Sequence, residues 1–174
     1  MSLELCCLIQ HSFLFFDCLC IFVVNIRIMT FEQLKLENQL CFPLYAASRL
    51  IIRKYQPYLD ALGVTYPQYL VLMVLWERDE VPVNDIAKKL ILNTNTVTPL
   101  LKRMEKLEII SRERSHEDER RVVVKLTSKG MRMKESAAQI PVVLGENLTC
   151  GSLDMEDLID LKDRLHKIIE CMDK

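Results

Sequence analysis

Hydrophobic positions recur every three or four residues over most of this chain, which is the pattern of amphipathic helices. From Met29 onward the pattern predicts helices over residues 40–61, 65–79, 84–90, 95–107, 127–140 and 152–172. The periodicity changes after the fourth helix, where two β-forming runs, 109–114 and 121–126, flank a polar tip at 115–120. The sequence therefore predicts a mainly α chain with a small β-hairpin wing, an α+β fold.

Local signals set several boundaries of these elements. Thr65 and Gln68 form a capping-box pattern that starts the second helix, and Asn84 is suited to cap the third. Pro141 ends the fifth helix, and a glycine-containing linker leads to the last one, which Ser152 caps. By its spacing, the second helix is expected to bury Tyr69, Leu72, Met73, Leu75 and Trp76.

The helices at 84–90 and 95–107 are separated by a short turn and followed by the hairpin, which is the order of a winged helix-turn-helix. The first turn of the second helix carries short hydrogen-bonding side chains: Thr94, Asn95, Thr96 and Thr98. Such side chains suit base edges and phosphates in a major groove, where the N-terminal end of a recognition helix makes contact. The sequence therefore predicts binding to double-stranded DNA, although the same elements occur in folds that bind no nucleic acid.

Positive charge is concentrated locally rather than spread over the chain. The formal net charge is -1, so any nucleic-acid surface must be a patch. Residues 102–125 carry eight Lys and Arg residues against six acidic ones. A handful of well-placed cations per monomer is enough for the electrostatic part of DNA binding, and a dimer doubles the count.

Residues 1–28 differ in kind from the rest. An apolar run from Phe13 to Val24 is broken by Asp17, and the segment lacks the basic start and the small-residue cleavage site of a secretory signal. Asp17 would cost about 2.5–3.5 kcal/mol at the centre of a membrane helix. We expect the working protein to begin at or near Met29, with 1–28 an upstream misreading or a disordered appendage; a membrane anchor is the alternative.

The cysteine pattern favours a reducing cytoplasm. Of seven cysteines, four lie in the first twenty residues, which leaves Cys41, Cys150 and Cys171 as an odd and widely spaced set. That set is unlike a disulfide framework or a paired zinc motif. No metal constellation, phosphate loop or Ser/His/Asp set is visible, so the sequence implies no cofactor.

The last predicted helix has the spacing of a helix–helix seam. Its apolar residues follow steps of three, four, three and four: Leu158, Leu161, Leu165, Ile168 and Met172. This stripe could dock on the chain's own core. Two-fold symmetry would instead place two recognition helices about one turn of DNA apart on a pseudo-palindromic operator, so we expect a homodimer built from N- and C-terminal dimerisation helices.

Three segments carry a resemblance to a known family: 37–45, 97–103 and 116–121. Together with the order of elements, they resemble the MarR family of winged-helix repressors, and within it the members that sense organic hydroperoxides. The resemblance covers residues 29–174 and implies that Cys41 is the peroxide-sensing thiol. It places Tyr45, Tyr55 and Tyr66 at the positions of tyrosines that hydrogen-bond to the sensor.

Elementary chemistry agrees with this assignment of Cys41. The thiolate is the reactive form, and a position near a helix start lowers a thiol pKa. Tyr45 lies one helical turn on and shares the same face, while hydroxyls of Tyr55 and Tyr66 could favour the thiolate by donating hydrogen bonds. The alternative is that Cys41 is a small buried hydrophobe among core aromatics.

The resemblance also implies which residues serve as the resolving cysteine and as the DNA contacts. Relatives use either one essential cysteine or a second, C-terminal one that forms an intersubunit disulfide, and Cys150 lies roughly where that resolving cysteine would be. The DNA contacts implied are Thr94, Asn95, Thr96, Thr98, Lys102 and Arg103 from the helix, with Arg120 of the wing in the minor groove, oriented by Asp118 and followed by Arg121. Both cysteine mechanisms remain open at this point.

Two departures from the family pattern affect the backbone. Pro43 fits the first helix only if Cys41 lies near its start. Glu108 stands at a helix end where glycine is usual, so it would occupy a strained left-handed position.

These observations converge on a homodimeric repressor that is not an enzyme and that leaves its operator when an organic hydroperoxide oxidises Cys41. One alternative is a family member that binds a small phenolic ligand instead. A thiol peroxidase that merely contains such a fold is the other alternative.

Overall fold

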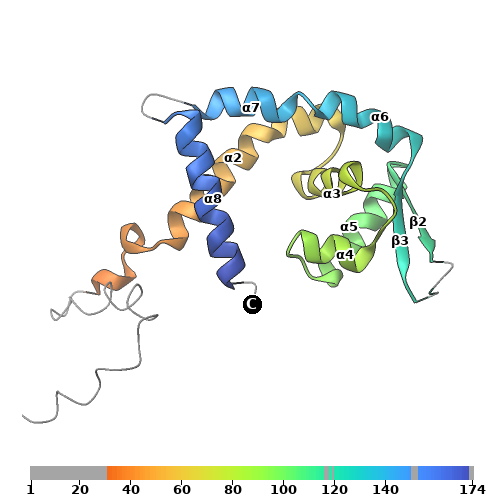
Figure 1. Cartoon of the computed structure of the whole chain (residues 1–174), viewed down its shortest axis with the longest axis horizontal. Coiled ribbons are helices and arrows are strands. Elements are labelled where there is room, and N and C mark those ends of the chain that lie inside the picture. Colours follow the sequence, from red (N-terminus) through yellow and green to blue (C-terminus); the bar gives the residue numbers. More distant parts are fainter. Residues whose placement is uncertain (1–30, 116–117, 119, 150–152, 173–174) are drawn as a thin grey trace, which may run out of the picture. The chain divides into compact units, whose positions relative to one another are not determined.

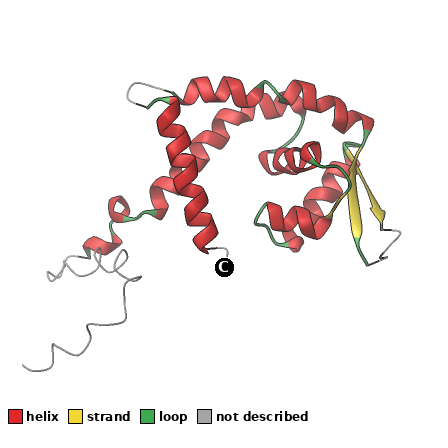
Figure 2. Cartoon of the chain, viewed as in Figure 1, coloured by secondary structure: helices red, strands yellow, loops and turns green. Residues whose placement is uncertain are grey.

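The computed structural model describes residues 31–115, 118, 120–149 and 153–172, in two compact units, 1–49 and 50–174. The leader and Cys150 lie outside the described residues. The elements in chain order are η1 (Glu32–Leu34), η2 (Leu36–Asn38), α2 (Cys41–Leu62), α3 (Tyr66–Glu77), β1 (Val81–Pro82), α4 (Val83–Lys89), α5 (Thr94–Lys106), β2 (Ile110–Arg114), β3 (Val122–Leu126), α6 (Ser128–Ala137), α7 (Ile140–Leu148) and α8 (Met155–Met172) (Figures 1 and 2).

Helix α2 begins at Cys41, as the position of Pro43 required. Pro43 falls in the first turn, where a backbone N–H has no partner within the helix, so its missing donor costs nothing. The helix also continues through Pro57 to Leu62. Gly63 then takes the left-handed conformation (φ +69°) that commonly ends a helix.

The wing is part of a three-stranded antiparallel sheet with the order β1-β3-β2. The hairpin prediction is confirmed: β2 pairs with β3 from Ile110 opposite Leu126 to Arg114 opposite Val122. Strand β1 was not predicted, because it has two residues and one of them is Pro82. An edge strand accepts proline, since only one of its sides needs ladder hydrogen bonds.

Helices α3, α4 and α5 pack together beside this sheet (Figure 1). Their facing side chains contribute most of the buried core. The expected capping box starts α3, with the Thr65 backbone N–H donating to Gln68 Oε1 at 2.8 Å. Met73 was expected in the core and is 44% exposed, because α3 turns the opposite face, with Val71, Leu72 and Leu75, inward. The largest fully buried side chains are Leu59, Leu72, Leu75, Ile86, Leu101, Met104, Ile109, Ile110, Val71, Val97 and Val124.

Two further sequence predictions are wrong. Pro82 rather than Asn84 occupies the N-cap of α4, so Asn84 lies inside the helix. The segment after Pro141 is not a linker but helix α7, which begins at Ile140. Pro141 falls in the first turn of α7, where proline is favoured rather than disruptive.

Helix α8 exposes its apolar stripe in the single chain. Asp154 caps it through reciprocal hydrogen bonds with Asp157, at 3.0 and 2.9 Å; Ser152, the expected cap, lies outside the described residues. No residue of α8 is buried, and Leu161, Ile168 and Met172 are exposed. The expected homodimer would cover this stripe.

No single helix of the described segments has the length and apolar character needed to cross a membrane, although α2 and α3 satisfy the criterion as a bent pair.

Gly130 is the point where α3, the end of α5 and α6 meet. The Trp76 indole N–H donates to the Gly130 carbonyl at 2.9 Å, and the Gly130 N–H donates to the Thr127 hydroxyl at 3.2 Å. A Cβ at this position would collide with the carbonyl oxygen of Ile109. Glycine is therefore required here by close backbone approach.

Gly130→Ala should lower the free energy of unfolding by about 2 kcal/mol, because the added methyl forces α6 away from the end of α5. Gly145→Ala is the matched control, since its Cβ would meet only Met155 Cε at 3.7 Å, an ordinary contact. That variant should be neutral or more stable by up to about 1 kcal/mol, because alanine favours the helix. Urea unfolding followed by circular dichroism measures the free energy of unfolding of both variants. Equal effects would contradict the conclusion that close backbone approach requires glycine at position 130.

Candidate nucleic-acid interface

Helix α5 presents one face to the core and its first turn to solvent. Val97, Leu101 and Met104 are buried. The predicted contact residues Thr94, Asn95 and Thr96 are all exposed. Thr98 is half-buried and donates its hydroxyl to the Thr94 carbonyl at 2.8 Å, which leaves its oxygen available as an acceptor. Lys102 and Arg103, further along the helix, are also exposed.

The C-terminal end of α5 closes with hydrogen bonds of the Schellman type. The Ile109 N–H donates to the Met104 carbonyl at 3.1 Å, and the Glu108 N–H donates to the Glu105 carbonyl at 2.9 Å. Glu108 has φ +58°, which confirms that it occupies the left-handed position expected from its place in the sequence. Such a conformation costs a residue with a side chain about 1–2 kcal/mol, so the neighbouring contacts must hold it.

The tip of the wing carries two exposed arginines, Arg120 and Arg121, beside Asp118. Asp118 Oδ1 accepts the Arg120 backbone N–H at 3.1 Å, and Asp118 Oδ2 lies 3.4 Å from Arg121 Nε. Asp118 therefore holds Arg120 through its backbone and contacts the side chain of Arg121. The side chain of Arg120 is exposed, as a group that enters a DNA groove must be.

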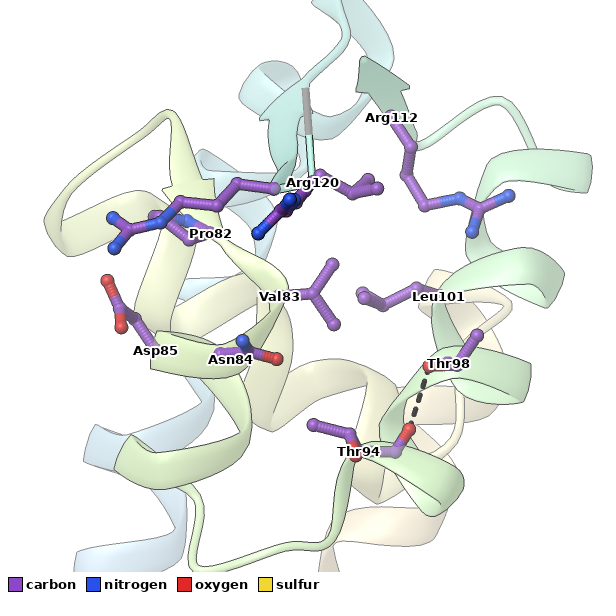
Figure 3. Close-up of a pocket in the computed structure, with 11 residues that line it drawn as sticks. Pro82, Val83, Asn84, Asp85, Thr94, Thr98, Leu101, Arg112 and Arg120 are labelled. Atoms are coloured by element: carbon purple, nitrogen blue, oxygen red, sulfur yellow. Dashed lines mark hydrogen bonds between the residues drawn. The ribbon is translucent and has the colours of Figure 1, made fainter. Parts of the chain in front are cut away.

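A hollow of about 290 Å³ lies between the start of α4, helix α5 and the base of the wing (Figure 3). Val83 and Leu101 point toward each other inside it, and its polar lining is Asn84, Asp85, Thr94, Thr98, Arg112, Arg120 and Arg121. Asp85 and three arginines line this concave surface, but the Arg112 guanidinium is paired with Glu105 of α5. The hydroxyls of Thr94 and Thr98 and the guanidinium groups of Arg120 and Arg121 suit phosphates and base edges.

The hollow brings together four of the predicted contact residues and adds three that the sequence prediction did not name. Thr94, Thr98, Arg120 and Arg121 line it, whereas Asn84, Asp85 and Arg112 are new. Arg112 was visible in the sequence only as one of the eight cations of residues 102–125. Its position in the centre of strand β2 gave no signal that it would face α5.

The proposed sensor residues of the first unit are exposed. Cys41 is a free thiol at the first position of α2, and Tyr45 follows it by four residues. The Arg49 guanidinium lies 5.5 Å from the centre of the Tyr45 ring, within cation–π range. The alternative that Cys41 is a buried hydrophobe is therefore wrong for the single chain.

Tyr55 and Tyr66 belong to the second unit and contact each other. Their rings meet edge to face, with centroids 5.2 Å apart, and Tyr69 lies 5.9 Å from Tyr55. Burial raises the pKa of Tyr66, and burial followed by the nearby Tyr66 raises the pKa of Tyr55. Both hydroxyls therefore stay protonated at neutral pH and can donate hydrogen bonds.

The remaining cysteines divide between described and undescribed parts of the chain. Cys171 is a free, exposed thiol near the end of α8, and Cys150 lies outside the described residues. Within the described ranges, no group of three or more His, Cys, Asp or Glu side chains could hold a metal ion.

Comparison with known proteins gives consistent matches over most of the chain. Residues 53–137 match the family model described as transcriptional regulator SarA/Rot. The organic hydroperoxide resistance transcriptional regulator of Bacillus subtilis (strain 168) is 47% identical over 143 residues, covering 82% of this chain and 95% of that protein.

Two solved structures of AbfR, a protein of Staphylococcus epidermidis, are also similar. Reduced AbfR bound to DNA has a TM-score of 0.67 and 34% identity, covering 84% of this chain and all of that one. AbfR in its disulfide form has a TM-score of 0.59 and 34% identity, and the match covers 82% of this chain and 96% of that one.

Arg120→Ala should weaken binding to a specific DNA site by about 1–3 kcal/mol without changing the unfolding temperature, because an exposed groove-reading side chain is lost. The slope of log affinity against log salt should also become shallower by about one phosphate contact. Arg132→Ala, which removes an exposed arginine from α6, is the control for charge alone. Equal losses in the two variants, measured by fluorescence anisotropy at several salt concentrations, would remove Arg120 from the interface.

Proposed function

The chain belongs to the winged-helix transcriptional regulators of the MarR/SarA type, and from that premise we propose that it is a homodimeric repressor which releases its operator when an organic hydroperoxide oxidises Cys41. DNA binding is known in this group, as the complex of reduced AbfR with DNA illustrates. The proposal adds the signal, the sensing atom and the direction of the response.

The observation that carries the proposal is the state of Cys41. It is a free and exposed thiol at the first position of a helix. The thiolate is the form of a cysteine that reacts with peroxides, and an exposed thiol is accessible to them. The name of the B. subtilis relative supports organic hydroperoxide as the inducer.

The reaction is a two-electron oxidation of sulfur. The Cys41 thiolate attacks the terminal oxygen of the hydroperoxide, an S–O bond forms, the O–O bond breaks, and the alcohol leaves after taking a proton. The product is a sulfenic acid. A second thiol then attacks that sulfur and expels water, which gives a disulfide.

We propose Cys150 of the partner subunit as the second thiol. The AbfR structure in its disulfide form supports a disulfide as the end product in a relative. A cellular low-molecular-weight thiol in place of Cys150 would give the one-cysteine version of the same switch. In either version each oxidation changes the state of one dimer, so the protein acts as a sensor rather than as a peroxidase.

Release of DNA needs the reduced and oxidised dimers to differ in operator affinity by about 1–3 kcal/mol or more. In a dimer, a change in the relative position of the two subunits can produce this difference in affinity, because both recognition helices must fit the two half-sites at once. The exposed apolar stripe of α8, including Leu161 and Ile168, is the surface that we propose for the two-fold contact.

The deciding experiment is a gel shift on DNA from upstream of the gene, before and after addition of cumene hydroperoxide. Wild-type protein should release the DNA, whereas Cys41→Ser should bind it equally well under both conditions, because the reacting sulfur is gone. Cys171→Ser is the matched control, since it also removes an exposed thiol, and it should respond like wild type. Release by the Cys41→Ser variant would refute the sensing role of Cys41.

Non-reducing electrophoresis after oxidation should show a covalent dimer that is absent from Cys150→Ser, because that variant has no resolving thiol on the partner subunit. The reduced wild-type protein supplies the baseline. A covalent dimer that persists in Cys150→Ser would exclude Cys150 and direct the test to the other cysteines of the chain, with Cys171 first.

A further inference from the structure

Among the described residues, an ion pair joins the recognition helix to the wing. Arg112, in strand β2, donates from Nε and Nη2 to Glu105 Oε2 of helix α5, at 3.1 and 2.6 Å. The side chains are 21% and 39% exposed, so water screens the pair only in part. Both nitrogens donate to the same carboxylate oxygen, so the pair restrains the direction of the guanidinium toward that oxygen as well as the distance between the two groups.

Both ends of this pair are attached to rigid parts of the structure. Arg112 lies at the middle of the β2–β3 ladder, opposite the buried Val124. Glu105 lies in the last turn of α5, between the buried Met104 and the helix end. The pair therefore fixes the direction of α5 relative to the sheet rather than the position of a loop.

The ion pair lies far from the first turn of α5, where the DNA contacts are expected, so a small change in the direction of the helix axis produces a large displacement there. Glu105 is eleven residues from Thr94, or about 16 Å along the helix axis. A rotation of about 10° at the C-terminal end would move the first turn by about 3 Å. Hydrogen bonds to base edges tolerate only about 0.5 Å, so a small change in tilt would break them.

The apolar contacts of α5 do not supply the same restraint. Val97, Leu101 and Met104 fix which face of the helix is buried, but hydrophobic attraction has no preferred direction. Lys129 adds a hydrogen bond from Nζ to the Leu107 carbonyl at 2.8 Å, beyond the helix end. Among the described residues, the ion pair is a directional side-chain contact between α5 and the strand that leads into the wing, in addition to the backbone hydrogen bonds that close the helix.

We propose that Glu105 and Arg112 are positioning residues for DNA recognition, which hold α5 and the wing at the relative angle that the two DNA grooves require. Neither side chain needs to touch DNA for this role. The inference rests on the DNA-binding part of the proposed function and not on oxidation, so it is tested on the reduced protein.

One substitution distinguishes this role from simple electrostatics by the direction in which it changes the affinity for DNA. Glu105→Gln removes a negative charge near DNA, and charge alone predicts tighter binding to every DNA. If the pair instead fixes the direction of the helix, its loss should lower the affinity for a specific site about tenfold. The affinity for non-specific DNA should then be unchanged or higher. The ratio of specific to non-specific affinity is therefore the decisive readout.

Glu113→Gln provides the matched control. Glu113 is likewise a carboxylate in an ion pair, but it lies in the wing and pairs with Lys125 of the same sheet at 3.3 Å. Its loss changes the net charge equally but leaves the contact between α5 and β2 intact. Fluorescence anisotropy with a specific and a scrambled duplex, over a range of salt concentrations, measures all three proteins.

Arg112→Gln and the double variant complete the test. If the two residues act through each other, Arg112→Gln should lower specific affinity with an unchanged salt slope, and the double variant should lose no more than the weaker-binding single variant. Equal behaviour of Glu105→Gln and Glu113→Gln would overturn the proposal. A salt slope that becomes shallower by about one in Arg112→Gln would also overturn it, by making Arg112 a phosphate contact. Failure of the wild-type protein to bind either duplex would instead refute the proposed function.

Discussion

Helix α5 is held firmly at one end and left open at the other, and the function of the winged-helix unit depends on that asymmetry. The last turns are fixed by buried Met104, by the ion pair between Glu105 and Arg112, and by the closing hydrogen bonds at Glu108 and Ile109. The first turn carries Thr94 to Thr96 in the exposed position that a groove requires. The first turn can be both accessible to DNA and well oriented only if the contacts that hold the helix lie elsewhere along it.

The same support links α5 to the helices outside the winged-helix unit. The Thr127 hydroxyl donates to the Glu108 carbonyl at 2.7 Å, next to the position where Gly130 packs against Ile109. These contacts stabilise the left-handed conformation of Glu108 and attach α6 to the end of the recognition helix. A movement of α6 would therefore reach the end of α5 through these contacts, which is the type of connection that the proposed switch between two dimer geometries would need.

Periodicity predicted the parts of this structure that depend on repeated local signals. The helix-turn-helix and the hairpin strands were found to within a residue or two, because apolar spacing and turn chemistry determine them. Helix α7 was missed because Pro141 ends a helix or begins one depending on its position in the turn, and β1 was missed because it is short. The contact of Arg112 with Glu105 depends on how β2 crosses α5, which no local pattern reveals. The sensing assignment of Cys41 came from resemblance, since a single helical cysteine carries little information.

The most direct test of this account is the structure of the reduced protein bound to its operator. The account predicts the first turn of α5 at base edges in the major groove and Arg120 in the minor groove. It also predicts that the ion pair between Glu105 and Arg112 remains intact in the complex. A complex in which α5 has rotated away from β2 with this pair broken, or in which α5 does not enter the groove, would contradict it.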